Sequence, residues 1–288
     1  MLTIGIIGAE NSHAASVAKL INVDRALKGC TVTHLWGETA AFARATAEAG
    51  RIATVVARPE EMLGQVDGVM IDHRDGQLHL AAARPFVRAG VPVFVDKPIC
   101  CSLPAARAFL RLRRAHGAPV CTMSSIAYHE DLPALATRLG QLGRLRQVHL
   151  SGPGDWRSPW SGIWFYGIHQ AELLVHLLGP GARTTSTTTN GTDCTAVVAY
   201  PDGLTATLQF LVDGPYEFRL HAVGHDGSLD AAMGHDPASL QRTTRIFTRM
   251  FRTRQEPFSD VRMLAPVALM QAVAQSLQQG SPVRVSRT

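Results

Sequence analysis

The chain has 288 residues, which corresponds to roughly two domains of about 150 residues, and 46% of its residues are hydrophobic. This composition excludes disorder as the dominant state, because disorder needs low hydrophobicity and a high net charge. The net charge is +5, but only 18% of the residues are charged and most arginines are scattered, so we expect no nucleic-acid partner. The sequence contains no continuous apolar run of about 18 residues, so we expect neither a membrane-spanning helix nor a membrane partner.

The N-terminal residues and the cysteines bear on the cellular setting. Residues 1–8 are typical of a β-strand that meets a glycine turn, with no basic region ahead of an apolar stretch, so we expect no signal peptide. The cysteines are odd in number and lack CxxC spacing, which predicts neither a zinc cage nor a disulfide framework. We expect reduced thiols in a cytoplasmic protein, at Cys30, Cys100, Cys101, Cys121 and Cys194.

Residues 1–122 alternate short apolar runs with segments of helical pattern. The expected strands are residues 2–7, 31–36, 52–56, 68–72, 91–95 and 119–122. The expected helices lie near residues 12–22, 38–49, 77–89 and 104–116. Short strands separated by helices of about 10 to 15 residues indicate βαβ units and a parallel sheet. We therefore expect this half to be a doubly wound α/β domain.

From residue 123 onward, β-rich runs separated by turn signals dominate the pattern. The expected strands are residues 145–150, 183–189, 194–200, 204–212 and 218–223, and the expected helices are residues 132–142, 166–178 and 260–279. A Pro-Asp-Gly turn at residues 201–203 predicts a hairpin, since Pro presets φ and Gly supplies a positive φ. Residues 123–288 should thus form an α+β domain with an open, mainly antiparallel sheet, and the last helix can pack back on the first domain.

One dense basic patch lies between residues 242 and 254. If this segment is a helix, three of its arginines share one face and its apolar residues, including Phe247 and Phe251, lie toward another. Two interpretations follow: a solvated helix that covers a sheet, which we favour, and a site for a polyanion. The five arginines are Arg242, Arg245, Arg249, Arg252 and Arg254.

The first candidate site follows the first expected strand, at Gly8. A strand, a glycine turn and a helix start bring backbone N–H groups and a helix dipole to one point, which favours a phosphate. The dinucleotide fingerprint G-x-G-x-x-G would begin at Gly8, but Glu10 and His13 stand where its second and third glycines would be. An ordinary strand–helix turn capped by Asn11 or Ser12 is an equally good interpretation.

The second candidate site is Asp96-Lys97-Pro98, after the fifth expected strand. A lysine at the C-terminal end of a parallel strand projects into the crevice where doubly wound sheets bind ligands. Pro98 biases Lys97 toward an extended conformation, and Asp96 is a candidate ion-pair partner. A surface lysine without a function is the alternative interpretation.

The third candidate site lies on the expected helix 166–178. His169 and Glu172 are i, i+3 neighbours, and His176 lies a further turn along the same face. Glu172 could orient the imidazole of His169 and raise its pKa, which would suit a proton carrier. Three such side chains could also hold a metal, but without a second cluster we expect none. A core histidine with a satisfied hydrogen bond is the alternative for His169.

Together these motifs resemble the Gfo/Idh/MocA oxidoreductase family, which contains glucose–fructose oxidoreductase and inositol dehydrogenase. Residues 96–98, Asp-Lys-Pro, stand where the family has Glu-Lys-Pro, and residues 167–172 are similar to its Gly-x-His-x-x-Asp. The strand and turn at residues 1–8 and His79 ahead of a helix add to a resemblance that covers essentially the whole chain. It implies a Rossmann domain that binds NAD or NADP, a second domain that receives the substrate, and a homodimer or homotetramer formed through the second domain's sheet.

The chain also departs from the family's pattern. Many family members carry an Asp four residues before the histidine, where this chain has Phe165, so Tyr166 supplies the nearest substitute hydroxyl. His73-Arg74-Asp75 replaces the usual Thr-Pro-Asn at the nicotinamide side of the cofactor. These departures indicate a divergent subgroup with an altered substrate, an altered mode of cofactor binding, or no hydride chemistry.

The residues and the resemblance together predict which side chains meet the ligands. We expect NAD rather than NADP, because Glu38 after the second strand would accept from ribose hydroxyls and repel a 2′-phosphate. The expected cofactor-binding residues are Gly8, Glu10, Asn11, Ser12, His13, Glu38, His73, Arg74, His79, Asp96 and Lys97. The expected substrate-binding residues are Trp156, Arg157, Trp164, Tyr166, His169 and Glu172.

The leading hypothesis is a nicotinamide-dependent oxidoreductase that acts on a small polar molecule such as a sugar or cyclitol. Lys97 would polarise the reacting oxygen, and His169, with Tyr166 beside it, would act as acid and base. One alternative is a lyase or hydrolase that uses NAD without net redox, and the other is a non-catalytic ligand-binding protein of the same fold.

Overall fold

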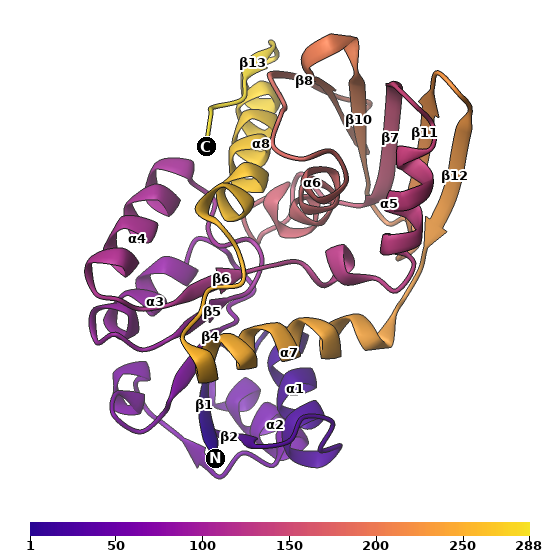
Figure 1. Cartoon of the computed structure of the whole chain (residues 1–288). Coiled ribbons are helices and arrows are strands. Elements are labelled where there is room, and N and C mark those ends of the chain that lie inside the picture. The colour runs from indigo at the N-terminus through magenta and orange to yellow at the C-terminus, as the bar shows by residue number, and fades with distance from the viewer. The chain divides into compact units, whose positions relative to one another are not determined.

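The computed structural model describes all 288 residues and comprises two compact units (Figure 1). The first unit consists of Met1–Cys100, Pro104–Met123 and Leu240–Ser259, and the second of Cys101–Leu103, Ser124–Ser239 and Asp260–Thr288. The expected single division after residue 122 therefore differs from the structure in one large segment, Leu240–Ser259, which belongs to the first unit. None of the helices combines the length and apolar character needed to cross a membrane.

The first unit is built on a six-stranded parallel sheet with the strand order β3-β2-β1-β4-β5-β6. This is the order of a doubly wound dinucleotide-binding fold, in which the order reverses between β1 and β4. The prediction of a Rossmann-type domain is confirmed. The strands are β1 (Leu2–Ile7), β2 (Cys30–Trp36), β3 (Thr54–Val55), β4 (Gly68–Ile71), β5 (Val93–Val95) and β6 (Val120–Thr122).

The strands β4, β5 and β6 are buried throughout, as expected for strands covered by helices. All four residues of β4 are buried, as expected for a central parallel strand. The connecting helices are α1 (Ser12–Ala18), which continues into a π-helical turn (Lys19–Val23), α2 (Ala40–Gly50), α3 (His79–Arg88) and α4 (Leu103–Ala115). A short 3-10 turn (Pro59–Met62) precedes β4.

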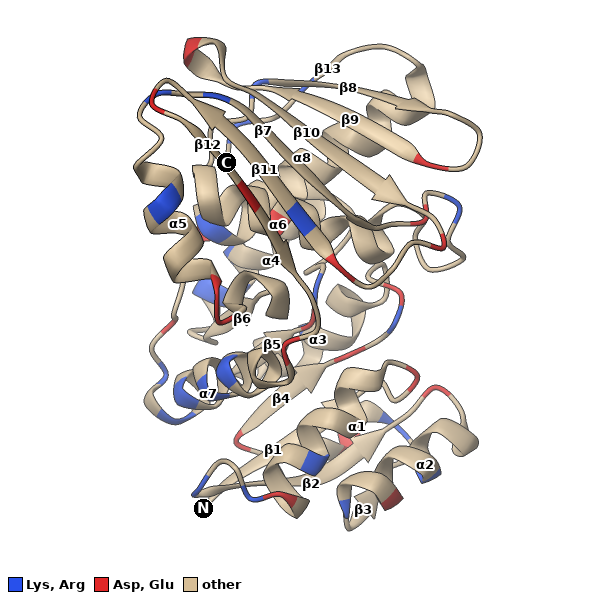
Figure 2. Cartoon of the chain, turned by 90° about the vertical axis from the view of Figure 1, so that its right-hand side faces the viewer, with Lys and Arg blue, Asp and Glu red and all other residues tan.

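Helix α7 (Pro237–Thr253) covers this sheet, although it follows the strands of the second unit in sequence. The ring of Phe247 stacks on that of Phe94 in β5 with 4.5 Å between centroids. Phe251 packs so closely on Gly68 in β4 that an added Cβ there would lie 2.4 Å from its ring. Arg245 and Arg249 are exposed on the opposite side, where Figure 2 shows basic residues along α7. The interpretation of the basic patch as a solvated helix that covers a sheet is confirmed.

The second unit contains a seven-stranded sheet with the order β12-β11-β7-β10-β9-β8-β13. All neighbouring pairs are antiparallel except β7 and β10, so the predicted α+β domain is confirmed. The strands are β7 (Leu145–Pro153), β8 (Thr184–Thr189), β9 (Cys194–Ala199), β10 (Thr205–Leu211), β11 (Phe218–Gly224), β12 (Ser228–Met233) and β13 (Val283–Arg284). The helices are α5 (Leu132–Gly140), α6 (Trp164–Leu178) and α8 (Asp260–Gln279), with 3-10 turns at Ser125–Tyr128 and Pro201–Gly203.

Candidate functional site

The turn after β1 requires a glycine at position 8. Gly8 has a φ of +108°, and a Cβ there would lie 2.5 Å from the carbonyl carbon of Asp72 and 2.6 Å from the backbone nitrogen of His73. A larger residue would push the β1 turn away from the segment that follows β4. Gly8 therefore lets the two central strand ends meet at the carboxyl edge of the sheet, where doubly wound folds bind ligands.

Glu38 closes this turn with one of its carboxylate oxygens. Its Oε2 accepts hydrogen bonds from the backbone N–H groups of Ala9 at 2.8 Å and Glu10 at 3.0 Å. Its Oε1 is buried and has no hydrogen-bond partner. The sequence predicted that Glu38 contacts a ribose. In the structure its Oε2 holds the turn, and its Oε1 can accept a hydrogen bond from a ligand hydroxyl.

A network of polar side chains surrounds Asp96 at the end of β5. The Asn11 amide donates to Asp72 Oδ1 at 3.1 Å and to Asp96 Oδ2 at 3.2 Å. His13 Nδ1 lies 3.1 Å from Asp96 Oδ1, and Lys97 Nζ lies 3.4 Å from Asp96 Oδ2. The structure thus brings together four residues that the sequence analysis singled out, and it adds Asp72, which the sequence analysis missed.

The two carboxyl groups of this network have opposite electrostatics. Burial alone would raise the pKa of Asp96, but the positive charges of Lys97 and His13 hold it below its ordinary value. Asp72 is fully buried, and burial together with the charge of Asp96 raises its pKa well above the ordinary value. Burial and the charge of Asp96 thus disfavour the charged form of Asp72, while the neighbouring cationic groups favour the charged form of Asp96.

Three atoms of this network could ligate a cation, because groups of His13, Asp72 and Asp96 lie within 4.8 Å of one another. Their surroundings favour a hydrogen-bonded network instead. The Asn11 amide already donates to both carboxylates, and the Lys97 ammonium supplies a positive charge to Asp96. A cation would have to compete with both donors.

His79, one of the expected cofactor-binding residues, lies in the interior of the first unit. It is fully buried, with its Nδ1 2.7 Å from the carbonyl oxygen of Pro98 and its Nε2 2.8 Å from that of His73. Both ring nitrogens thus hold the segments that follow β4 and β5. His73 itself stacks obliquely on Trp36, and burial followed by the charge of His79 lowers its pKa to about 4.

A nicotinamide dinucleotide fits the polar groups that the first unit leaves without partners. Glu38 Oε1, Asp72 Oδ2 and His73 Nδ1 are buried near the carboxyl ends of β2 and β4 without hydrogen-bond partners. Buried polar atoms in native proteins are nearly always paired, so such atoms point to a ligand with hydroxyl or amide groups. The other expected cofactor residues are less buried: Glu10 and Arg74 are half-buried, and Ser12, at the start of α1, is exposed.

In the second unit, His169 is buried on α6 with a hydroxyl as its partner. Its Nδ1 lies 2.6 Å from the Oγ of Ser124, which also accepts from the N–H of Ile126 at 3.3 Å. The imidazole lies among the rings of Tyr166 and Phe218, with centroids 5.7 and 5.9 Å away. A histidine fixed in this way can exchange a proton without changing its orientation.

The helix spacing predicted Glu172 as the partner of His169, and the structure places the hydroxyl of Ser124 at its Nδ1. Glu172 Oε2 accepts from Arg262 Nη1 on α8 at 2.9 Å. Burial raises the pKa of Glu172, and the charge of Arg262 opposes that shift. Glu172 therefore joins α6 to α8 inside the second unit.

The aromatic residues expected around the substrate divide into two groups. Trp164 is buried in the core of the second unit, and Trp156 donates through Nε1 to the carbonyl oxygen of Thr192. Arg157 lies over the Trp156 ring at 4.6 Å and donates to the Gly191 carbonyl. These contacts fix the loop before α6 on the β8–β9 turn.

Tyr166 instead belongs to an aromatic group around His169. Its ring meets those of Phe165 at 4.8 Å and Tyr216 at 6.4 Å. Phe165, where the family's Asp is expected, offers no proton to this group. Sequence analysis missed Tyr216, which stands in a loop without a motif.

One protein family matches the N-terminal part of the chain. The family described as "Oxidoreductase family, NAD-binding Rossmann fold" (GFO_IDH_MocA) matches residues 2–124, which include the Gly8 turn, Glu38 and residues 96–98. A protein of Amycolatopsis mediterranei (strain S699), "Putative UDP-kanosamine synthase oxidoreductase subunit", is 29% identical over 120 residues. This match covers 37% of the chain and 33% of that relative.

Several solved structures share the fold of the entire chain. A putative myo-inositol dehydrogenase from Sinorhizobium meliloti 1021 is 17% identical, with a TM-score of 0.84 over 99% of this chain and 100% of the other. A scyllo-inositol dehydrogenase from Lactobacillus casei with bound NAD(H) and scyllo-inositol is 13% identical, with a TM-score of 0.84 over 99% of each chain. GenD2 from gentamicin A biosynthesis, in complex with NAD, is 16% identical, with a TM-score of 0.84 over 99% of this chain and 96% of the other. At such identities these likenesses establish the fold.

Proposed function

Because residues 2–124 match the Gfo/Idh/MocA family of NAD-binding oxidoreductases, we propose that the chain transfers hydride between NAD and a small polar hydroxy or keto compound. The family match confirms the resemblance drawn from the motifs and NAD as the family's cofactor. The observation that carries the proposal is the buried Lys97–Asp96 ion pair at the carboxyl edge of the parallel sheet. A cyclitol or sugar is the proposed substrate class, consistent with the scyllo-inositol bound by the Lactobacillus casei relative.

Lys97 stabilises the charge that develops on the reacting oxygen. NAD, when bound, supplies or takes up the hydride. Meanwhile the Lys97 ammonium donates to the oxygen of the substrate as that oxygen gains alkoxide character. Asp96 pairs with this ammonium within a buried setting, where an unpaired charge would be costly.

His169 transfers the proton that accompanies the hydride. In the tautomer of the basic form that carries its proton on Nδ1, the imidazole donates to the Oγ of Ser124 and takes up the substrate's proton at Nε2. In its acidic form both nitrogens carry protons, and Nε2 returns one to the substrate. The hydroxyl of Tyr166, whose ring meets that of His169, is the second polar group on this face of α6.

The proposal includes a preference for NAD over NADP. Glu38 Oε1 is a buried acceptor that suits a ribose hydroxyl, and its negative charge repels a 2′-phosphate. Calorimetric titration of the wild-type protein with both dinucleotides tests this preference. Tighter binding of NADP(H) would contradict it, and Glu10→Gly shows whether the side chain at the second turn position weakens binding.

One observation favours a second candidate function, in which NAD is used without net redox. Two backbone N–H groups of the turn, at Ala9 and Glu10, are already occupied by Glu38, and Phe165 cannot relay a proton. In this second function the hydride would return to the substrate before the product leaves. Accumulation of free NADH during turnover distinguishes the first function from this one.

We also propose that the protein is cytoplasmic and forms a homo-oligomer. Its cysteines are free thiols, which suits a reducing compartment. The outward face of the seven-stranded sheet carries mainly Thr, Gln and His side chains, and Val197 in the middle of β9 is 44% exposed among them. A second copy that packs on this face would bury it.

The experiment for the proposed function is a substrate panel. The full chain is incubated with NAD and with inositols, hexoses and sugar acids, and NADH absorbance is followed. We expect NADH formation with one substrate class. Failure of the protein to bind either dinucleotide, measured separately by calorimetry, would contradict the proposal and leave a ligand-binding role.

A further inference from the structure

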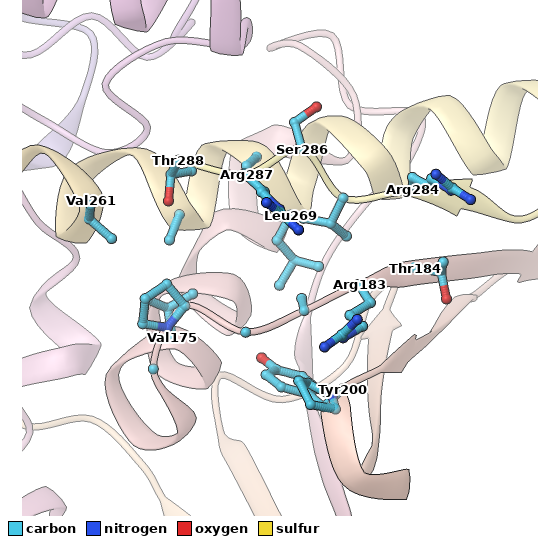
Figure 3. A pocket seen from close by; sticks show the side chains of 18 residues that line it. Val175, Arg183, Thr184, Tyr200, Val261, Leu269, Arg284, Ser286, Arg287 and Thr288 are labelled. Carbon is cyan, nitrogen blue, oxygen red and sulfur yellow. The ribbon is translucent and has the colours of Figure 1, made fainter.

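The second unit contains a cavity that lies away from His169 and Ser124. Its volume is about 720 Å³, within the usual range for small-molecule sites. It is lined by the C-terminal end of α6, the N-terminal half of α8, the start of β8, the end of β9 and the last residues of the chain (Figure 3). Neither His169 nor any other residue with a proposed catalytic role lines it.

The floor of this cavity is apolar and its rim is basic. Val175 from α6 and Leu269 from α8 belong to the floor. Arg183, Arg284 and Arg287 line the cavity, and no Asp or Glu side chain does. Guanidinium groups beside an apolar floor favour an organic anion, because carboxylate and phosphate groups match their geometry.

Arg183 stands on a rigid part of the wall. Its backbone N–H donates to the carbonyl oxygen of Ala199 at 2.8 Å, and its carbonyl oxygen accepts from the N–H of Val285 at 2.8 Å. The backbone of this arginine is thus fixed between the end of β9 and the C-terminal segment. An anion bound there would meet a side chain whose base is already ordered, which lowers the entropic cost of binding.

Tyr200 provides an independent observation. Its side chain lines the cavity and is only 8% exposed, yet its hydroxyl is buried without a hydrogen-bond partner. Burial also raises the pKa of this phenol, so the hydroxyl keeps its proton. A buried hydroxyl without a partner costs free energy unless a ligand or water satisfies it.

We propose that this cavity binds a small organic anion, with its apolar part on the α6–α8 floor, its carboxylate or phosphate group at Arg183 and Arg287, and a hydrogen bond to the Tyr200 hydroxyl. Figure 3 shows these side chains around the same hollow. The site is separate from the proposed hydride-transfer residues, so it does not depend on the proposed function.

Three probes of matched shape test the site on the full chain by calorimetry: octanoate, octyl phosphate and neutral octanol. We expect one of the two anions to bind and octanol to bind at least about fivefold more weakly. The double variant Arg183→Gln/Arg287→Gln should lose about five- to tenfold in affinity for that anion. Arg138→Gln, an exposed arginine on α5 away from the cavity, is the matched control and should bind like the wild type.

Tyr200→Phe separates a ligand site from a structural cavity. The hydroxyl has no partner within the protein, so its removal should leave the melting temperature unchanged or raise it, while anion affinity falls about two- to tenfold. Three outcomes would overturn the proposal: no binding of either anion, equal binding of octanol, or unchanged affinity in the double arginine variant. None of these readouts uses NAD or turnover, so their failure is distinguishable from failure of the oxidoreductase proposal.

Discussion

The role of the Asp72 side chain could not be predicted from a sequence pattern. It follows a buried strand, and nothing in its neighbours signals that its carboxyl group meets Asp96 through the Asn11 amide. Lys97 and Asp96 could be predicted because they form a motif at a strand end. Ser124 and Asp72 could not, since an isolated polar residue after a strand is compatible with many partners. Glu38 was placed at the right strand end, but its contact with the turn depends on a side-chain direction that no pattern gives.

We expect Asp72→Asn to stabilise the protein at neutral and alkaline pH. Folding raises the pKa of this carboxyl, so its contribution to stability is fully present below the unfolded value near 3.9 and is lost as pH rises through the folded value. The variant should gain about 1.4 kcal/mol for each unit by which folding raises this pKa. Urea unfolding between pH 4 and pH 9 measures it.

The control for this prediction is Asp24→Asn, which removes an exposed carboxylate paired with Lys19. Its stability should differ little from that of the wild type at every pH. If Asp72→Asn were no more stable than the wild type at pH 9, Asp72 would not be a carboxyl group that the fold holds in its protonated form.

Ser124 should act as a positioning residue for His169. We expect Ser124→Ala to lower kcat about tenfold and to move the histidine step in the pH–rate profile, because the imidazole loses the hydroxyl at Nδ1. Ser124→Thr keeps the hydroxyl and should restore most of the rate. An unchanged pH profile in the Ala variant would show that this hydrogen bond does not tune the imidazole.

Helix α7 shows what periodicity reveals about an element and what it does not. The alternation of arginines with Phe247 and Phe251 predicted a helix with one solvated and one buried face. It could not reveal which sheet the buried face covers, because that depends on complementary surfaces such as Phe94 and Gly68. Strands β12 and β13 were missed for a related reason, since it is their pairing with β11 and β8 that makes them strands.

We expect Phe247→Ala to destabilise the first unit by about 3–5 kcal/mol, because it removes a fully buried ring stacked on Phe94. Arg249→Gln, on the exposed face of the same helix, should change stability by less than about 0.5 kcal/mol. Chemical denaturation with the intrinsic tryptophan signal compares the two variants. Similar losses in both would mean that α7 is not held by its apolar face.

The fold of each unit was within reach of the sequence, because alternating strands and helices admit few doubly wound arrangements. The return of Leu240–Ser259 to the first unit was not, since no linker composition marks it.

Association of copies is likewise a property of surfaces. We expect the wild type to be a dimer or tetramer by light scattering, and Val197→Glu on the exposed face of β9 to shift it toward the monomer. A monomeric wild type would contradict the proposed interface.

The central claim is that Lys97 stabilises the alkoxide during hydride transfer. It is tested most directly by single-turnover kinetics of wild type and Lys97→Ala with the substrate found in the panel, beside calorimetric affinities for NAD. We expect the variant to lose a factor of about 10² to 10³ in rate while its affinity for NAD changes less than about threefold. A Lys97→Ala protein that transfers hydride at nearly the wild-type rate would contradict the account.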